Sequence, residues 1–161
     1  MNAIAARAIE AMDFLLDAVG QIPSESWDHP SNLDGWSIRD LVVHTTGSAA
    51  KLVALAGGDT SEPTDDLPQL AARLKDAVAK KDPDTSLSFP IVGLTIHGWD
   101  VYQSQHRPVE VPDDLLAFCR QVVEAVPEDE LRRPGLFGPA KPAPEDATPT
   151  ARFMAYVGRA A

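Results

Sequence analysis

The stretch SIRDLVVHTTGSAAKLVALAGG, residues 37–58, carries the strongest helix signals in this chain. Ser37 is a favourable N-cap, and Asp40 follows three residues later, as in a variant of the capping box. Apolar and small residues recur every three or four positions, which places them on one face of a helix. The paired glycines at the end of the stretch stop the helix. These residues therefore predict a long amphipathic helix with one buried side.

Prolines divide the rest of the chain into further helical windows. The sequence has 14 prolines in 161 residues, and because proline interrupts a helix interior, the long proline-free windows are the candidate helices. Each of these windows carries apolar residues at helical spacing. The windows are residues 1–22, 31–62, 69–82, 91–107 and 113–126.

The C-terminal part has a different pattern. Prolines are too frequent in residues 133–145 for a regular helix, so we expect an extended segment there. Thr148 and Pro149 then form an N-cap and a first helical position for a short last helix. We therefore predict one all-α domain over residues 1–161. It is an up-and-down four-helix bundle with an additional helix and an extended, Pro-rich C-terminal segment that ends in a short helix.

The charge balance excludes several classes of partner. The chain has 24 acidic residues against 14 Lys and Arg, for a formal net charge of -10. Nucleic-acid binders need clustered cations, and acidic membranes repel an acidic surface, so we expect neither nucleic acid nor membrane as a partner. We find no export signal and no stretch approaching about 20 apolar residues. One cysteine excludes an internal disulfide and Cys-rich metal sites. We expect a cytoplasmic protein.

Two of the four histidines, His44 and His97, lie inside the two most apolar windows. His97 belongs to a narrow polar strip with Gly93, Asp100 and Ser104 on an otherwise apolar helix. Such a strip faces either water or an internal site shared with another helix. Neutral imidazole binds zinc, nickel, iron or copper, and bundle helices can present such ligands into a cleft. Spacing alone leaves metal ligation and the commoner alternative, boundary histidines hydrogen-bonded to backbone or carboxylate, both open.

The neighbours of these histidines include two carboxylates and two tryptophans. Asp40 comes four residues before the first histidine, and Asp100 comes three residues after the second. Either carboxylate could orient an imidazole or reach an ion directly, although capping its own helix is the expected role of Asp40. Trp36 and Trp99 flank the histidines, and we take them as candidate walls of an apolar pocket.

Two motifs, GWSIRDLVVH at residues 35–44 and HGWD at residues 97–100, resemble the DinB-like metal-binding family. More narrowly, they are similar to its actinobacterial branch, which is related to the mycothiol-dependent maleylpyruvate isomerases. The ending, FGP at 137–139 and DATPTARFMAYVGR at 146–159, also resembles that branch. The resemblance covers essentially the whole chain. It implies a four-helix bundle that holds a divalent metal, zinc or nickel, through three side chains.

The resemblance maps two of those three ligands onto His44 and His97. In relatives the third ligand is a His, Glu or Asp one turn before the second histidine, where this chain has Gly93. Three outcomes follow: Asp100 or another carboxylate substitutes, water fills the position, or the site is empty. The larger relatives also carry a second domain after the bundle, which helps to form their active site.

These observations support two hypotheses of function. In the first, the chain is a metal-binding enzyme, a thiol transferase or isomerase, whose ion polarises a small thiol such as mycothiol or a carbonyl substrate. In the second, the chain is a non-catalytic helical bundle with a degenerate metal site, which binds a ligand or forms a homodimer. The sequence leaves open whether the protein is an enzyme.

Overall fold

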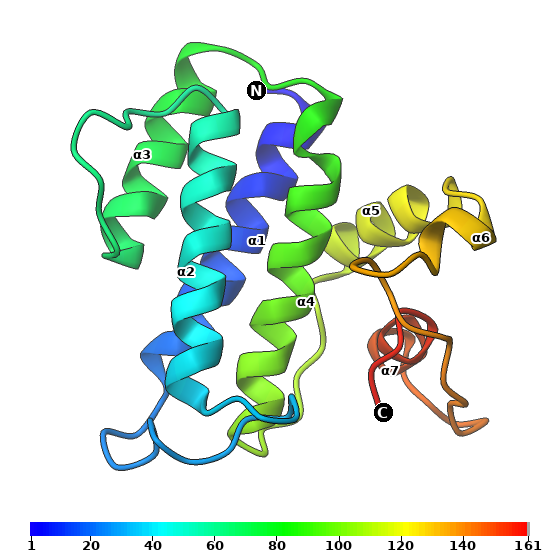
Figure 1. Cartoon of the computed structure of the whole chain (residues 1–161). Coiled ribbons are helices and arrows are strands. Elements are labelled where there is room, and N and C mark those ends of the chain that lie inside the picture. Colours follow the sequence, from blue (N-terminus) through cyan, green and yellow to red (C-terminus); the bar gives the residue numbers. More distant parts are fainter. Residues whose placement is uncertain (161) are drawn as a thin grey trace. The chain divides into compact units, whose positions relative to one another are not determined.

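The computed structural model describes residues 1–160, and all of its regular secondary structure is helical (Figure 1). They form seven α-helices and one short 3-10 helix, and no β-strand occurs within these 160 residues. The all-α prediction is thus confirmed. The chain divides into two compact units, residues 1–109 and the residues from Glu110 onward. A single domain over the whole chain stays a prediction. None of the described helices is long and apolar enough to cross a membrane.

The first unit is a bundle of four long helices. Each falls within or close to a proline-free window, which confirms this way of dividing the chain. α3 and α4 begin slightly earlier than expected, at Leu67 and Ser88, because proline is tolerated in the first turn of a helix. The four helices are α1 (Ala3–Gly20), α2 (Ile38–Leu55), α3 (Leu67–Lys80) and α4 (Ser88–Ser104), the last preceded by the 3-10 turn Thr85–Leu87.

The start of α2 has the expected capping box. The Ser37 hydroxyl accepts a hydrogen bond from the Asp40 backbone N–H at 3.1 Å, and the Asp40 carboxylate accepts one from the Ser37 N–H at 3.0 Å. Each side chain thus satisfies a backbone donor that the first turn leaves unpaired. At the other end Gly57 adopts φ +83°, a conformation that favours glycine and ends the helix.

The chain does not alternate strictly up and down through this bundle. Gln105, just after α4, donates to the Ala18 carbonyl near the end of α1, so these two helices run in the same direction. Asn2, which caps the start of α1, donates to the Pro83 carbonyl just after α3, so those two helices run in opposite directions. α2 runs parallel to α3, as Figure 1 shows. The prediction of a simple up-and-down course is therefore wrong at the connection between α2 and α3.

The connection itself explains this departure. Residues 56–66 form an irregular segment between α2 and α3, and Arg73 of α3 donates to the carbonyls of Asp59 and Glu62 within it. Extended chain covers about 3.3 Å per residue and helix only about 1.5 Å, so this segment can return along the full length of the 14-residue α3. A tight turn would have forced the two helices to be antiparallel.

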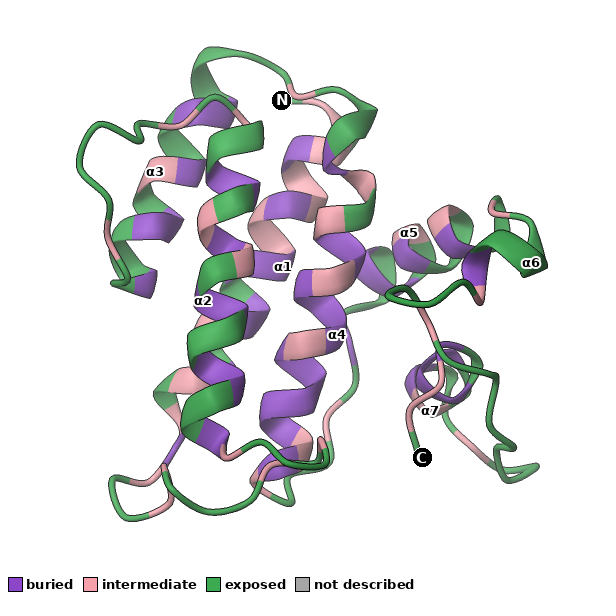
Figure 2. Cartoon of the chain, viewed as in Figure 1, coloured by how far each residue is buried: buried purple, intermediate pink, exposed green. Residues whose placement is uncertain are grey.

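Close packing of α1 against α4 forms the centre of the bundle. A Cβ atom at Gly98 would lie 2.7 Å from the Phe14 ring, closer than such atoms approach, so glycine is required for this contact. Tyr102 of α4 donates a hydrogen bond to the Asp17 carboxylate of α1. Figure 2 shows the buried sides of α1, α2, α3 and α4 turned toward one another. α4 is thereby held firmly along one side.

The second unit contains α5 (Asp113–Glu124), α6 (Glu128–Leu131) and α7 (Pro149–Tyr156). Thr148 caps α7 and Pro149 begins it, as predicted. The segment between α6 and α7 contains turns and irregular backbone with no helix. Arg132 links this segment to the end of α7, because its guanidinium donates hydrogen bonds to the carbonyls of Gly138 and Tyr156, at 2.7 and 2.8 Å.

Candidate metal centre

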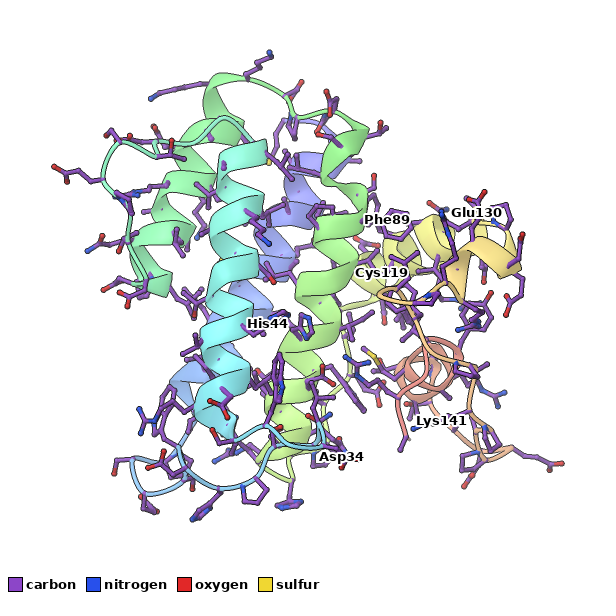
Figure 3. All side chains as sticks on the ribbon, in the orientation of Figure 1. Asp34, His44, Phe89, Cys119, Glu130 and Lys141 are labelled. Carbon is purple, nitrogen blue, oxygen red and sulfur yellow. The ribbon has the colours of Figure 1, made fainter. Side chains whose placement is uncertain are left out.

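His44 of α2 and His97 of α4 lie side by side. Their ring centroids are 5.0 Å apart and their ring planes meet at 85°. The His44 side chain, labelled in Figure 3, projects from α2 toward α4. The His97 side chain is 19% exposed, so the two rings meet at the surface edge of the bundle rather than deep within its core. The polar strip on α4 therefore faces a second helix at this point.

The separation of the rings fits a shared metal ion. An imidazole nitrogen binds zinc at about 2.1 Å, which places the ring centroid about 3.2 Å from the ion. Two imidazoles around a roughly tetrahedral ion then have centroids about 5 Å apart. The observed 5.0 Å matches this value. The same separation also suits direct edge-to-face contact between the rings.

Asp100 orients His97. Its carboxylate Oδ2 lies 3.2 Å from His97 Nδ1, and the residue is completely buried. With Asp100 ionised, Nδ1 is the donor, and the neutral ring then presents Nε2 with a free electron pair. The other carboxylate oxygen, Oδ1, accepts a hydrogen bond from Asn32 Nδ2 at 2.8 Å. The geometry thus gives Asp100 an orienting role, and both its oxygens are engaged by protein groups.

Two further residues, Asn32 and Ser104, belong to the hydrogen-bond network around Asp100. The sequence motifs did not identify either of them as part of it. The Asn32 backbone N–H donates to the Ser104 hydroxyl at 3.0 Å, and Ser104 Oγ lies 2.8 Å from the Asp100 carbonyl and 3.0 Å from Asn32 Oδ1. Ser104 belongs to the same polar strip as Asp100, which was the available signal. Asn32 lies in an irregular segment far away in the sequence, where periodicity carries no information.

The other candidate residues divide into those near the histidines and those away from them. The Trp36 ring lies 5.0 Å from the His44 ring at an interplanar angle of 64°, so it walls one side of the site. Asp40 is occupied in capping α2. Trp99 is 5% exposed and lies about 200° around α4 from His97, in the bundle core. Trp36 is therefore the candidate wall residue that contacts a histidine.

The position to which the resemblance assigns a third ligand has no side chain but does have room for one. A Cβ atom added to Gly93, one turn before His97, would meet no described heavy atom within 4 Å apart from its chain neighbours and the backbone of its own helix. Across residues 1–160, no cluster of three or more His, Cys, Asp or Glu side chains is arranged to hold a metal ion. The protein residues at this centre thus supply two imidazoles.

The electrostatic environment favours neutral His44. Partial burial of the ring lowers its pKa, and electrostatic repulsion from nearby His97 and Lys51 lowers it further. The neutral ring is the form that can bind a metal ion, because the ligand atom needs a free electron pair. Over residues 1–160, the ring nitrogens of His44 have no hydrogen-bond partner in the protein. One of them is consequently available to a ligand.

The fold and the histidine pair place the chain in a class of protein, the four-helix bundle with one histidine on each of two neighbouring helices. Side chains on facing helices of such bundles can bind a metal ion or cofactor between them. Residues 8–90, just over half of the chain, match the family model of the mycothiol maleylpyruvate isomerase N-terminal domain. The chain belongs to this family, which confirms the resemblance read from its motifs. The matched segment includes His44 and ends before Gly93 and His97. No match was found among curated proteins or solved structures.

Proposed function

We propose that this protein binds a divalent metal ion between His44 and His97. The observation that carries the proposal is the 5.0 Å separation of the two rings, together with the hydrogen bond that orients His97 through Nδ1. Nε2 of His97 and one ring nitrogen of His44 would be the protein ligands. Zinc and nickel are the ions that we propose, because imidazole suits both.

The chemistry we propose is a transfer or isomerisation that depends on a small thiol, for which mycothiol is the candidate from the family description. A bound ion would act as a Lewis acid and would lower the pKa of a coordinated thiol. Two protein ligands leave positions for water and substrate, at the cost of weaker metal binding. Trp36 offers an apolar surface beside these positions, and a thiol or carbonyl compound is the proposed substrate.

Metal binding can be tested by titrating the metal-free protein with Zn²⁺ in a calorimeter. We expect one ion per chain, and we expect His44→Ala and His97→Ala each to weaken binding at least about tenfold. His29→Ala is the matched control, because His29 is exposed and belongs to the same unit. Zn²⁺ affinity unchanged by both site variants would overturn the proposal.

A second candidate function follows from Gly93. With two imidazoles and no third ligand, the bundle could be a non-catalytic module with a degenerate site that binds a ligand or forms a homodimer. Equal Zn²⁺ binding by the wild type and both histidine variants, without turnover of thiol substrates, would favour this candidate. Sedimentation analysis of the same samples then reports whether the chain forms a dimer.

A further inference from the structure

The second unit contains a pocket between α5 and α7. Its volume is about 290 Å³. Val123 and Phe153 are its buried apolar residues, Pro149 extends the apolar surface, and the arginines Arg120 and Arg152 are exposed. The pocket lies outside the segment that matches the family, and it shares no residue with the candidate metal centre.

The size and floor of this pocket suit a short hydrocarbon group. A closed cavity of about 150 Å³ holds one benzene molecule, so 290 Å³ has room for an aromatic ring with a short chain. Binding of such a group against Val123 and Phe153 would be favourable mainly because the apolar surface of the bound group leaves water. A pocket of this kind, with a few charged groups, is typical of small-ligand sites.

The positive charges of the two arginines favour an anionic head group. Arg120 Nε lies 3.8 Å from the Glu124 carboxylate, and both side chains are more than half exposed, so this is a loose ion pair. Arg152 donates through Nε to the Ala147 carbonyl at 3.0 Å and through another nitrogen to the Glu145 carbonyl. These bonds to backbone fix its guanidinium without neutralising its charge. Guanidinium groups bind carboxylates well because their planar donors match the two oxygens.

We propose that this pocket binds a small amphipathic carboxylate, with its hydrocarbon group on Val123 and Phe153 and its head group at Arg120 and Arg152. Glu124 opposes the anion, since its charge competes for Arg120. The site requires neither a metal ion nor either of the two central histidines. Its existence is therefore independent of the function proposed above.

Three probes with the same hydrocarbon group test the charge preference: 4-phenylbutyrate, 4-phenylbutan-1-ol and 4-phenylbutylamine. We expect the carboxylate to bind about three- to tenfold more tightly than the alcohol, and the amine to bind most weakly. Protein NMR titrations of the full chain at low salt give the three dissociation constants and show which residues shift. Equal affinities, shifts outside α5 and α7, or no binding of the carboxylate would overturn the proposal.

Two single substitutions should move the affinity in opposite directions. Arg120→Gln should weaken 4-phenylbutyrate about threefold or more, and Glu124→Gln should strengthen it by a similar factor. Arg133→Gln is the matched control, because Arg133 is exposed in the same unit but does not line the pocket. All three residues are exposed, so circular dichroism should show intact helices. Equal effects of the two arginine substitutions, or weaker binding by Glu124→Gln, would contradict the proposed site.

Discussion

The two halves of the candidate metal centre are built differently. On α4, His97 is held by a buried carboxylate that is itself held by Asn32. On α2, His44 contacts the Trp36 and His97 rings and has no orienting carboxylate within the described residues. In the proposed metal centre, one imidazole would therefore be fixed in advance, while the other could adjust its ring when an ion binds. Rigid ligands favour affinity, whereas an adjustable ligand permits exchange of water or substrate.

The largest expected effect is the loss of the orienting carboxylate on the α4 side. Asp100→Asn should weaken Zn²⁺ binding about 10- to 100-fold, because His97 Nδ1 loses its charged partner. Asp40→Asn on the α2 side should leave Zn²⁺ affinity unchanged and reduce stability by at most about 1 kcal/mol, as its carboxylate only caps the helix. Calorimetric titration and urea unfolding measure both quantities. Equal losses of metal affinity in the two variants would remove the distinction between the halves.

Two glycines of α4 provide a comparison of its packed and open sides. Gly98→Ala should destabilise the protein by about 1–3 kcal/mol, because the new Cβ would overlap the Phe14 ring. Gly93→Ala should instead stabilise it by up to about 1 kcal/mol, because alanine is a better helix former and the space there is open. Urea unfolding of both variants checks the signs. Destabilisation by Gly93→Ala would show that this position is not open.

Gly93→Asp tests whether the α4 side can supply a third ligand. We expect Zn²⁺ to bind at least about tenfold more tightly, since the new carboxylate would lie one turn from His97 on the same face. Gly93→Asn is the control, with similar size and no charge. The gain should disappear when His97→Ala is added. An unchanged affinity would mean that the two helices do not present a competent three-ligand geometry.

The smallest expected effect concerns the contact of α4 with α1. Burial raises the pKa of Tyr102 well above its usual range, and the hydrogen bond to Asp17 raises it further. Above about pH 10 the unfolded tyrosine loses its proton while the folded one keeps it, so stability should fall as the pH rises. Tyr102→Phe should be less stable than the wild type at pH 8 and should show a smaller loss between pH 9 and 11. Urea unfolding over this range measures the difference.

The sequence predicted the long helices well because their signals are local. Ser37 and Asp40 sit next to the first turn that they cap, and proline and glycine act on neighbouring residues. The relative directions of the helices were harder to predict, because the parallel course of α2 and α3 depends on how residues 56–66 return along the bundle. α6 has four residues, too few for any periodic pattern, and was not predicted.

The candidate site shows the same contrast between local and distant information. His44 and His97 were identified from their positions on apolar helices and from family motifs, and their proximity is now seen. The role of Asp100 remained open in the sequence, because a carboxylate three residues from a histidine can orient the ring or bind an ion. The hydrogen bond from Asn32 to Asp100 favours the orienting role, and Asn32 is 68 residues away and has no motif of its own.

The parallel packing of α1 on α4 has a consequence for the order of folding. α1 makes its most extensive helix contacts with α4, the last helix of the first unit, and not with the helices that follow it directly. During synthesis, the apolar side of α1 therefore stays uncovered until some eighty further residues have been made and α4, its main partner, emerges. A fragment that stops at residue 90, where the family match ends, would leave this side of α1 uncovered and should aggregate rather than fold.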